Sequence, residues 1–176
     1  AGRVIRLAEN EMTIADIIAD GFYWLVKTSP SAVSIRSDRS AAATTGSKTV
    51  VTASGDWSTA VATCCPGAAE ATGRQSAAVA TGDESVAIAA SYQSAAVATG
   101  DQSGTRARGD QSAAVATGDQ SATIALGVQS AAVVVGYQSA AIATGDRSIA
   151  VAAGEQSAAT ASSTSACAIA CGWRGT

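Results

Sequence analysis

Three aspartates are the residues best placed to do chemistry together, because they recur at a fixed spacing. Asp83, Asp101 and Asp119 each follow a glycine and are separated from one another by 18 residues. If each interval is one coil of the chain, their carboxylates stack about 4.8 Å apart, which is the spacing of neighbouring strands. Like charges at that distance repel each other unless solvent separates them or a cation bridges them. The pattern leaves two interpretations, a row of solvated turn residues and a cation site.

The residues around these aspartates favour the solvated interpretation. Calcium-binding nonapeptide repeats have the form GGxGxDxUx. Units such as "GDQSAAVAT" lack the second and third glycines of that form. We therefore expect no metal ion and no other cofactor.

The other reactive side chains do not form a catalytic set. The chain has no histidine, which removes the commonest general base and the commonest metal ligand. It also has no phosphate-binding loop and no GxSxG motif. We expect no catalytic residue and no enzymatic activity. Arg106 and Arg108 form a small basic spot with Glu70 two predicted coils away, and we interpret these charges as residues that face solvent.

The four cysteines do not indicate a disulfide framework or a zinc site. Cys64 and Cys65 are adjacent, whereas Cys167 and Cys171 lie four residues apart in a predicted strand. That separation is about 13 Å along a strand, which is too far for a mutual disulfide. We interpret all four as small apolar fillers.

Composition excludes several classes of partner. The net charge is −3, with 11 Lys and Arg against 14 Asp and Glu, so the basic surface of a nucleic-acid-binding protein is absent. No apolar run approaches the roughly 20 residues that span a membrane. Residues 1–12 lack the basic-then-apolar layout of a secretory signal. Only 4% of the residues are aromatic, so a conventional core would lack large side chains to fill it.

A nine-residue unit repeats without insertions from residue 37 to residue 171. Each unit holds a turn such as "GDQS", then five residues of mainly Ala, Val, Ile and Thr, which favour a strand. Repetition at a fixed period is typical of a solenoid. Two units then make an 18-residue coil with two facing strands. We predict an all-β parallel β-solenoid, a two-sided roll of about eight coils; a three-sided coil of 27 residues is the alternative.

Variation within the unit predicts which places face inward. Counted from the glycine, the fourth place is mostly serine and the sixth and eighth are mostly alanine, whereas the fifth, seventh and ninth vary and include Glu70 and Arg106. The interior of a thin roll must be uniformly small, so serine and alanine point in. The reversed arrangement, with valine inside, would bury these two charges without evident partners.

Alternate units have different outward residues. One set has Val or Ile at every central place and no charge, and we call its outward surface the valine face. The other set carries Thr52, Glu70, Ile88, Arg106 and Ile124 at that place, and we call its surface the mixed face. The predicted interaction residues of the valine face are Thr59, Val61, Thr63, Val79, Thr81, Val97, Thr99, Val115, Thr117, Val133, Val135 and Val151.

The turn residues predict ladders between coils. Inward serine hydroxyls can satisfy backbone amides of the turns. Glutamines at the third place can form amide ladders of the kind found in stacked strands. These glutamines are Gln75, Gln93, Gln111 and Gln129 on one edge and Gln102, Gln120, Gln138 and Gln156 on the other.

Residues 1–27 differ from the repeat, which occupies residues 28–176. We predict a strand over 3–10, a short helix that Thr13 caps, and a second strand over 21–27 with Phe22, Tyr23 and Trp24. An open end of a solenoid needs a cover. This segment is therefore interpreted as a cap or as an anchor that docks the rod onto a larger assembly.

The stretch "ESVAIAASYQSAAVATG" at 84–100 resembles the SVAIG and SxAxG repeats of trimeric autotransporter adhesin heads. The nine-residue GxxSAAxAT pattern also resembles Ala-rich repeat proteins of phages and prophages. Both resemblances imply a non-enzymatic structural rod on a virion or cell surface. The adhesin heads are β-rolls with small residues inside and Val or Ile turned toward a trimer axis.

A long exposed row of valine and threonine exceeds the apolar patch that soluble monomers usually leave open. We therefore expect a rod that self-associates, with a trimer favoured, or that binds other structural proteins of a virion, fibre or surface assembly. The alternative is an ice-binding protein whose Thr and Val ranks order water on the same face. Neither function involves nucleic acid or a membrane.

Overall fold

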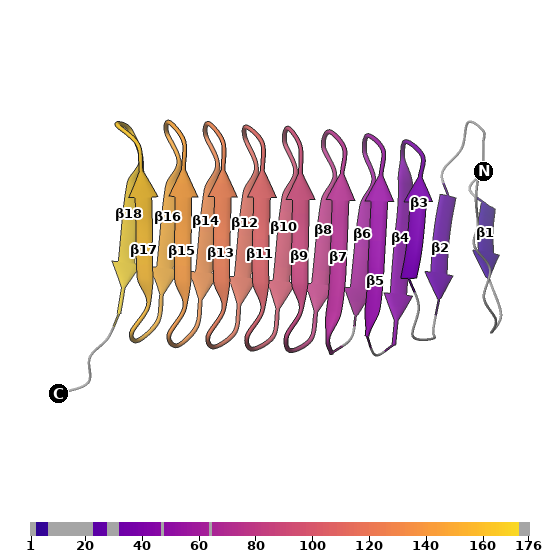
Figure 1. Cartoon of the computed structure of the whole chain (residues 1–176), viewed down its shortest axis with the longest axis horizontal. Coiled ribbons are helices and arrows are strands. Elements are labelled where there is room, and N and C mark those ends of the chain that lie inside the picture. The colour runs from indigo at the N-terminus through magenta and orange to yellow at the C-terminus, as the bar shows by residue number, and fades with distance from the viewer. Residues whose placement is uncertain (1–2, 7–22, 28–31, 47, 64, 173–176) are drawn as a thin grey trace.

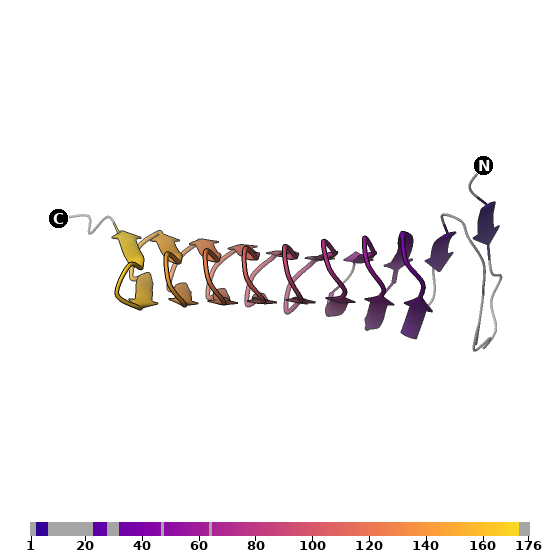
Figure 2. The ribbon, with the colours of Figure 1, turned by 90° about the horizontal axis from the view of Figure 1, so that it is seen from above.

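Two parallel sheets face each other in a computed structural model of the chain. The structure describes residues 3–6, 23–27, 32–46, 48–63 and 65–172. Consecutive strands of the repeat region alternate between the sheets, so the chain winds into a straight rod (Figures 1 and 2). Sheet A has 10 strands in the spatial order β1 (Arg3–Arg6), β2 (Tyr23–Lys27), β4 (Ser40–Thr45), β6 (Thr59–Thr63), β8 (Ala77–Thr81), β10 (Ala95–Thr99), β12 (Ala113–Thr117), β14 (Ala131–Val135), β16 (Ile149–Ala153) and β18 (Cys167–Cys171). Sheet B has 8 strands in the order β17 (Ala158–Ser162), β15 (Ala140–Thr144), β13 (Ala122–Leu126), β11 (Gly104–Arg108), β9 (Val86–Ala90), β7 (Gly67–Thr72), β5 (Thr49–Ser54) and β3 (Ala32–Arg36).

The strand register confirms the 18-residue, two-sided coil. In sheet A, Val97 pairs with Val79 on one side and with Val115 on the other. In sheet B, Arg106 pairs with Ile88 and with Ile124. Each partner lies 18 positions away in the sequence, which rules out the 27-residue coil. Like residues therefore form straight columns along the rod.

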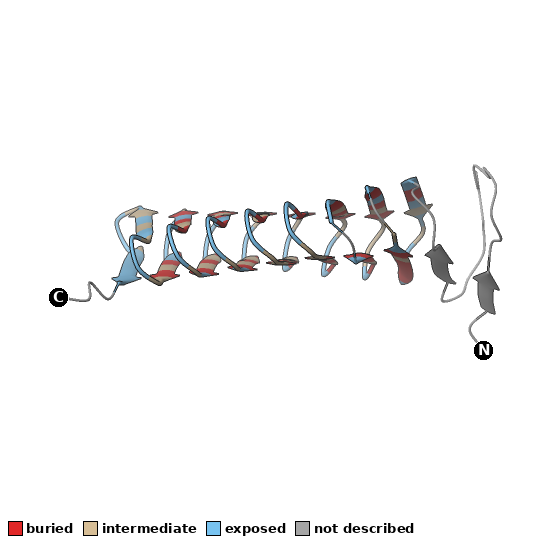
Figure 3. Ribbon diagram, turned by 90° about the horizontal axis from the view of Figure 1, so that it is seen from below, coloured by how far each residue is buried: buried red, intermediate tan, exposed pale blue. Residues whose placement is uncertain are grey.

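The interior consists of alanine and serine, as predicted. Ala96 and Ala98 on β10 have no exposed surface, and Ala87 and Ala89 on β9 are equally buried. The buried stripes run along the inner side of both sheets (Figure 3). Val97 is half-buried, with its outward side on the surface. The reversed arrangement, with valine inside, is therefore wrong.

A few interior places hold larger side chains that the repeat pattern does not predict. Val51 and Val134 are fully buried, and so are Thr44 and Thr123. The hydroxyl oxygens of Thr44, Thr105 and Thr123 have no hydrogen-bond partner among the described residues. The interior thus tolerates single substitutions of Ala by Val or Thr, although most coils keep to alanine.

The inward serines link each turn to the preceding coil. The hydroxyl of Ser112 donates to the carbonyl of Ser91 at 2.9 Å and accepts from the backbone N–H of Ser94 at 3.2 Å. Equivalent pairs recur along both edges, for example at Ser121. The prediction that serine satisfies turn amides is confirmed, and each hydroxyl satisfies a carbonyl as well.

The first turn glycine is required by the close approach of successive coils. Gly118 has a φ of +136°, and a Cβ at this position would lie 2.2 Å from the carbonyl oxygen of Gly100. A side chain is excluded both by that contact and by the backbone conformation. Two residues later, Gln120 has a φ of +56°, the left-handed conformation that reverses the chain toward the next strand.

Residues 1–27 are described only in part. The predicted strands over 3–10 and 21–27 correspond to β1 and β2, which pair in parallel and continue sheet A onto β4. The predicted helix and Phe22 lie outside the described residues. The interpretation of this segment as a cap or anchor stays a prediction.

Candidate interaction faces

The valine face is the outer surface of sheet A from β6 to β18. Its central column is Val61, Val79, Val97, Val115, Val133, Val151 and Ile169, in register from strand to strand. The outward places of these strands carry no charged residue. At the C-terminal end of the face the exposed fractions are 48% for Val135 and 43% for Ile169. The face is therefore flat, regular and apolar.

A threonine column runs beside the valine column. Thr63, Thr81, Thr99 and Thr117 pair in sequence across four strands. Thr63 and Thr117 are exposed and the two between them are half-buried. The hydroxyl of Thr63 donates to the carbonyl of Thr44 at 3.1 Å. Beyond β12 the column changes to Val135 and Ala153.

The mixed face, on the outside of sheet B, differs in both charge and shape. Its central column includes Glu70, Ile88 and Arg106 on three successive strands. Arg108 lies exposed two places after Arg106 on the same strand. Gly104 opens the strand, and a Cβ added there would meet no atom within 4 Å. The strand β11 therefore combines a small notch with two guanidinium groups.

Glutamine ladders line both edges of the rod, as predicted. On one edge the side-chain amide of Gln75 donates to Gln93 at 3.0 Å, and Gln93 donates to Gln111 at 2.9 Å. On the other edge Gln138 donates to Gln156 at 2.8 Å. All these glutamines have left-handed backbones, which the sequence pattern did not indicate.

The stacked aspartates have a partner that sequence reasoning missed. The carboxylate of Asp83 accepts from the backbone N–H of Asp101 at 3.1 Å, and Asp101 accepts from Asp119 at 2.9 Å. Asp119 in turn accepts from Tyr137 at 2.9 Å. Each carboxylate thus satisfies a turn amide of the next coil. Among the described residues no group of three His, Cys, Asp or Glu side chains could hold a metal ion.

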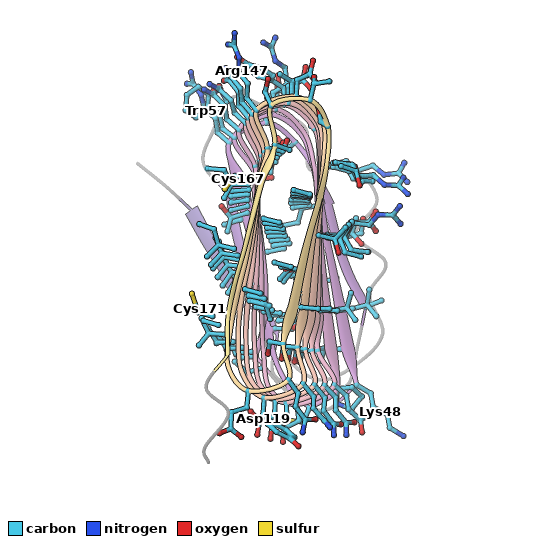
Figure 4. The ribbon with its side chains drawn as sticks, turned by 90° about the vertical axis from the view of Figure 1, so that its left-hand side faces the viewer. Lys48, Trp57, Asp119, Arg147, Cys167 and Cys171 are labelled. Carbon is cyan, nitrogen blue, oxygen red and sulfur yellow. The ribbon has the colours of Figure 1, made fainter. Side chains whose placement is uncertain are left out.

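The interpretation of the cysteines as packed fillers is wrong for the three that are described. Cys167 and Cys171 lie exposed on β18 (Figure 4), and Cys65 lies exposed in a turn. The sulfur of Cys65 accepts from the N–H of Asp83 at 3.2 Å. Cys64 lies outside the described residues. The repeat register assigned Cys167 and Cys171 to outward places, so the signal was present in the sequence.

The fold places the chain among parallel β-solenoid proteins built from sequence repeats. No protein-family model matches the chain, and no curated protein or solved structure matches it. The similarity to adhesin heads and to phage repeat proteins remains an interpretation of the repeat sequence. In the described part, none of the helical structure needed to cross a membrane as an apolar helix is present.

Proposed function

We propose that this protein is a non-enzymatic structural rod that self-associates through its valine face. The observation that supports the proposal is the unbroken column of Val and Ile, from Val61 to Ile169, on a surface without charge. Partly exposed apolar side chains in that number favour burial against another surface. Because every coil presents the same pattern, a second copy offers a surface of matching period.

A trimer fits the dimensions of the face. A five-residue strand is about 16 Å wide, and packed sheets lie about 10 Å apart. Three strands of that width, arranged as the sides of a triangular prism, each lie about 5 Å from the central axis. That distance is half of the usual sheet separation, so three valines from the central column fill the centre. The threonine and alanine columns then meet at the corners.

The place of such a rod is a virion, a fibre or a cell surface, where its first 27 residues attach it to other structural proteins. The proposal rests on the repeat, on the flat face and on the similarity to trimeric adhesin heads. The backbone ladders and stacked glutamines of the repeat region support a stiff element of fixed length.

The test is the mass of the protein in solution. Light scattering of the full chain at low concentration is expected to give three times the chain mass of 17.2 kDa. Val97→Lys would bring three ammonium groups together at the axis and is expected to abolish the trimer. Thr160→Lys, an equivalent central place on the mixed face, is the matched control and should leave the trimer intact. A monomeric wild-type protein contradicts the proposal.

Ice binding is the second candidate, and the threonine column favours it. The side chains of Thr63, Thr81, Thr99 and Thr117 form a single rank with one side chain for each strand. An ice-binding surface must remain uncovered, so this function requires a monomer or an oligomer that leaves the rank bare. Thermal hysteresis should then fall on Thr99→Tyr, which breaks the flat rank. Absence of hysteresis in the wild type contradicts this candidate.

A further inference from the structure

The mixed face carries two opposite charges placed symmetrically about one isoleucine. Glu70 on β7 pairs with Ile88 on β9, and Ile88 pairs with Arg106 on β11. Glu70 and Arg106 are both half-buried. Among the residues that the structure describes, no ion pair joins them, and Nε of Arg106 is buried without a hydrogen-bond partner. Each charge is held two coils from the group that would neutralise it.

We infer that a second copy of the chain packs on the mixed face by a two-fold axis that passes between the two Ile88 side chains. The axis runs parallel to the strands. This rotation keeps each place within the strand and reverses the order of the coils, so β7 faces the partner's β11. The carboxylate of Glu70 then meets the guanidinium of Arg106 from the other copy. An isologous contact makes the same pair twice.

The remaining mixed-face residues are compatible with this arrangement. The centre is apolar, because Ile88 meets its own copy between Val86 and Ala90. Arg108 lies opposite Thr72, and Arg36 lies opposite Thr144. The notch at Gly104 receives Ala68. Among the described outward places from β3 to β15, no two like charges oppose each other.

The charges specify one register among those that a repeating surface allows. A slip of one coil places Ile88 opposite Arg106 and leaves both charges covered without partners, which is costly. A slip of two coils in one direction places Arg106 opposite Arg106, and in the other direction it places Glu70 opposite Glu70. Only the axis at Ile88 joins both pairs. Long side chains can bridge sheets that pack about 10 Å apart.

The contact is small enough for these ion pairs to decide whether it forms. Seven strands, β3 to β15, overlap at a spacing of about 4.8 Å and a width of about 16 Å. This gives roughly 540 Å² for each copy and about 1,100 Å² in total, near the lower limit of specific interfaces. We expect weak association that depends on the charged pairs for register and specificity.

The two faces lie on opposite sides of the rod, as the view along its axis shows, with Cys167 and Cys171 marking the valine-face side (Figure 4). Both contacts can therefore be made at once. A three-fold contact through sheet A and a two-fold contact through sheet B generate an open layer of trimers. The mixed-face contact does not depend on the trimer, and it can form in its absence.

Charge exchange in a Val97→Lys background tests the contact without interference from the valine face. In this background the chain is expected to dimerise. Glu70→Arg is expected to raise the dimer dissociation constant at least about 100-fold, because both pairs become repulsive. Arg106→Glu should do the same. A mixture of these two variants should associate, because every facing pair is then opposite in charge. Chains with both substitutions should dimerise again.

Sedimentation equilibrium measures each mass, and circular dichroism verifies that every variant retains its strands. Arg147→Glu, in a turn at the edge of the rod, is the matched charge change outside the contact and should not alter the constant. A monomeric Val97→Lys protein overturns the inference, as does a mixture of the two variants that remains monomeric. A Glu70→Arg protein that dimerises as tightly as its parent overturns it as well. If the Val97→Lys variants fail to fold, the same mixture is made in the wild-type background, where it should link trimers.

Discussion

The two sheets have almost the same inner surface and different outer surfaces. On the inner side both present serine and alanine, with Ala96 in sheet A and Ala89 in sheet B fully buried. On the outer side sheet A presents uncharged columns, whereas sheet B presents Glu70, Arg106 and Arg108. Packing between the sheets constrains the inner residues equally, because each must fit the same narrow gap. The outer residues are free of that constraint, so a difference between them points to function.

Sheet B also shows that charge at an outward place is compatible with the fold. Arg106 pairs in register between Ile88 and Ile124 without a break in the ladder. The absence of charge from the same places of sheet A is therefore not required by folding. This comparison is the main reason to assign an interaction to the valine face.

The largest expected effect comes from enlarging an inner residue, and it should be the same in both sheets. Ala96→Leu and Ala89→Leu each add three carbons to a gap without space. Overpacking of a close-packed interior costs about 3 kcal/mol. Urea unfolding followed by circular dichroism should give similar losses for the two variants. A large loss in one sheet and none in the other would show that the inner surfaces are not equivalent. Val97→Leu, an outward change, is the control and should cost little.

A slightly smaller effect is expected where the coils approach most closely. Gly118→Ala places a Cβ 2.2 Å from the carbonyl oxygen of Gly100, and Gly109→Ala places one 2.3 Å from that of Ser91. Both residues also have φ values that L side chains rarely adopt. We expect each to lose about 2 to 3 kcal/mol of unfolding free energy, which the same urea titration measures. Gly104→Ala, at an open position, is the control and should be neutral or stabilising.

An intermediate effect is expected from the serine ladders. Ser112→Ala in the sheet A turns leaves the N–H of Ser94 and the carbonyl of Ser91 without their partner. Ser121→Ala removes the equivalent bonds from Ser103 and Gly100. Loss of a buried partner costs about 1 to 2 kcal/mol. Hydrogen exchange at Ser94 and Ser103 should accelerate in the respective variants. Unchanged exchange would mean that the hydroxyl does not hold the amide.

The repeat sequence was sufficient to predict the coil, the register and the direction of each place. That success has a physical cause, because a fixed period makes every strand report on its neighbours. Ala78 and Ala96 had to be inside once Glu70 and Arg106 were recognised as too costly to bury. The 18-residue difference between alternate units then separated the two faces.

The turns could not be predicted in the same way, because their chemistry acts between coils. Glutamine does not usually favour the left-handed conformation that Gln120 adopts. The carboxylate of Asp101 was expected to face solvent or a cation, and it accepts a backbone N–H from the next coil. The facing of Glu70 and Arg106 in a two-fold contact was also missed, since it requires the register of the strands and a second copy.

The smallest expected effect concerns the aspartate ladders, which lie on both edges. Asp110 accepts from the N–H of Val128, and Asp119 accepts from that of Tyr137, each at 2.9 Å. Asp→Asn keeps an acceptor oxygen and removes the charge, so Asp119→Asn should change the unfolding free energy by less than about 0.5 kcal/mol. Asp119→Ala also removes the acceptor and should cost about 1 kcal/mol, because the amide is exposed and can bind water. Asp110→Ala should match it if the two edges are equivalent. If Asp119→Asn were instead strongly stabilising, repulsion between stacked carboxylates would outweigh their bonds to the turns.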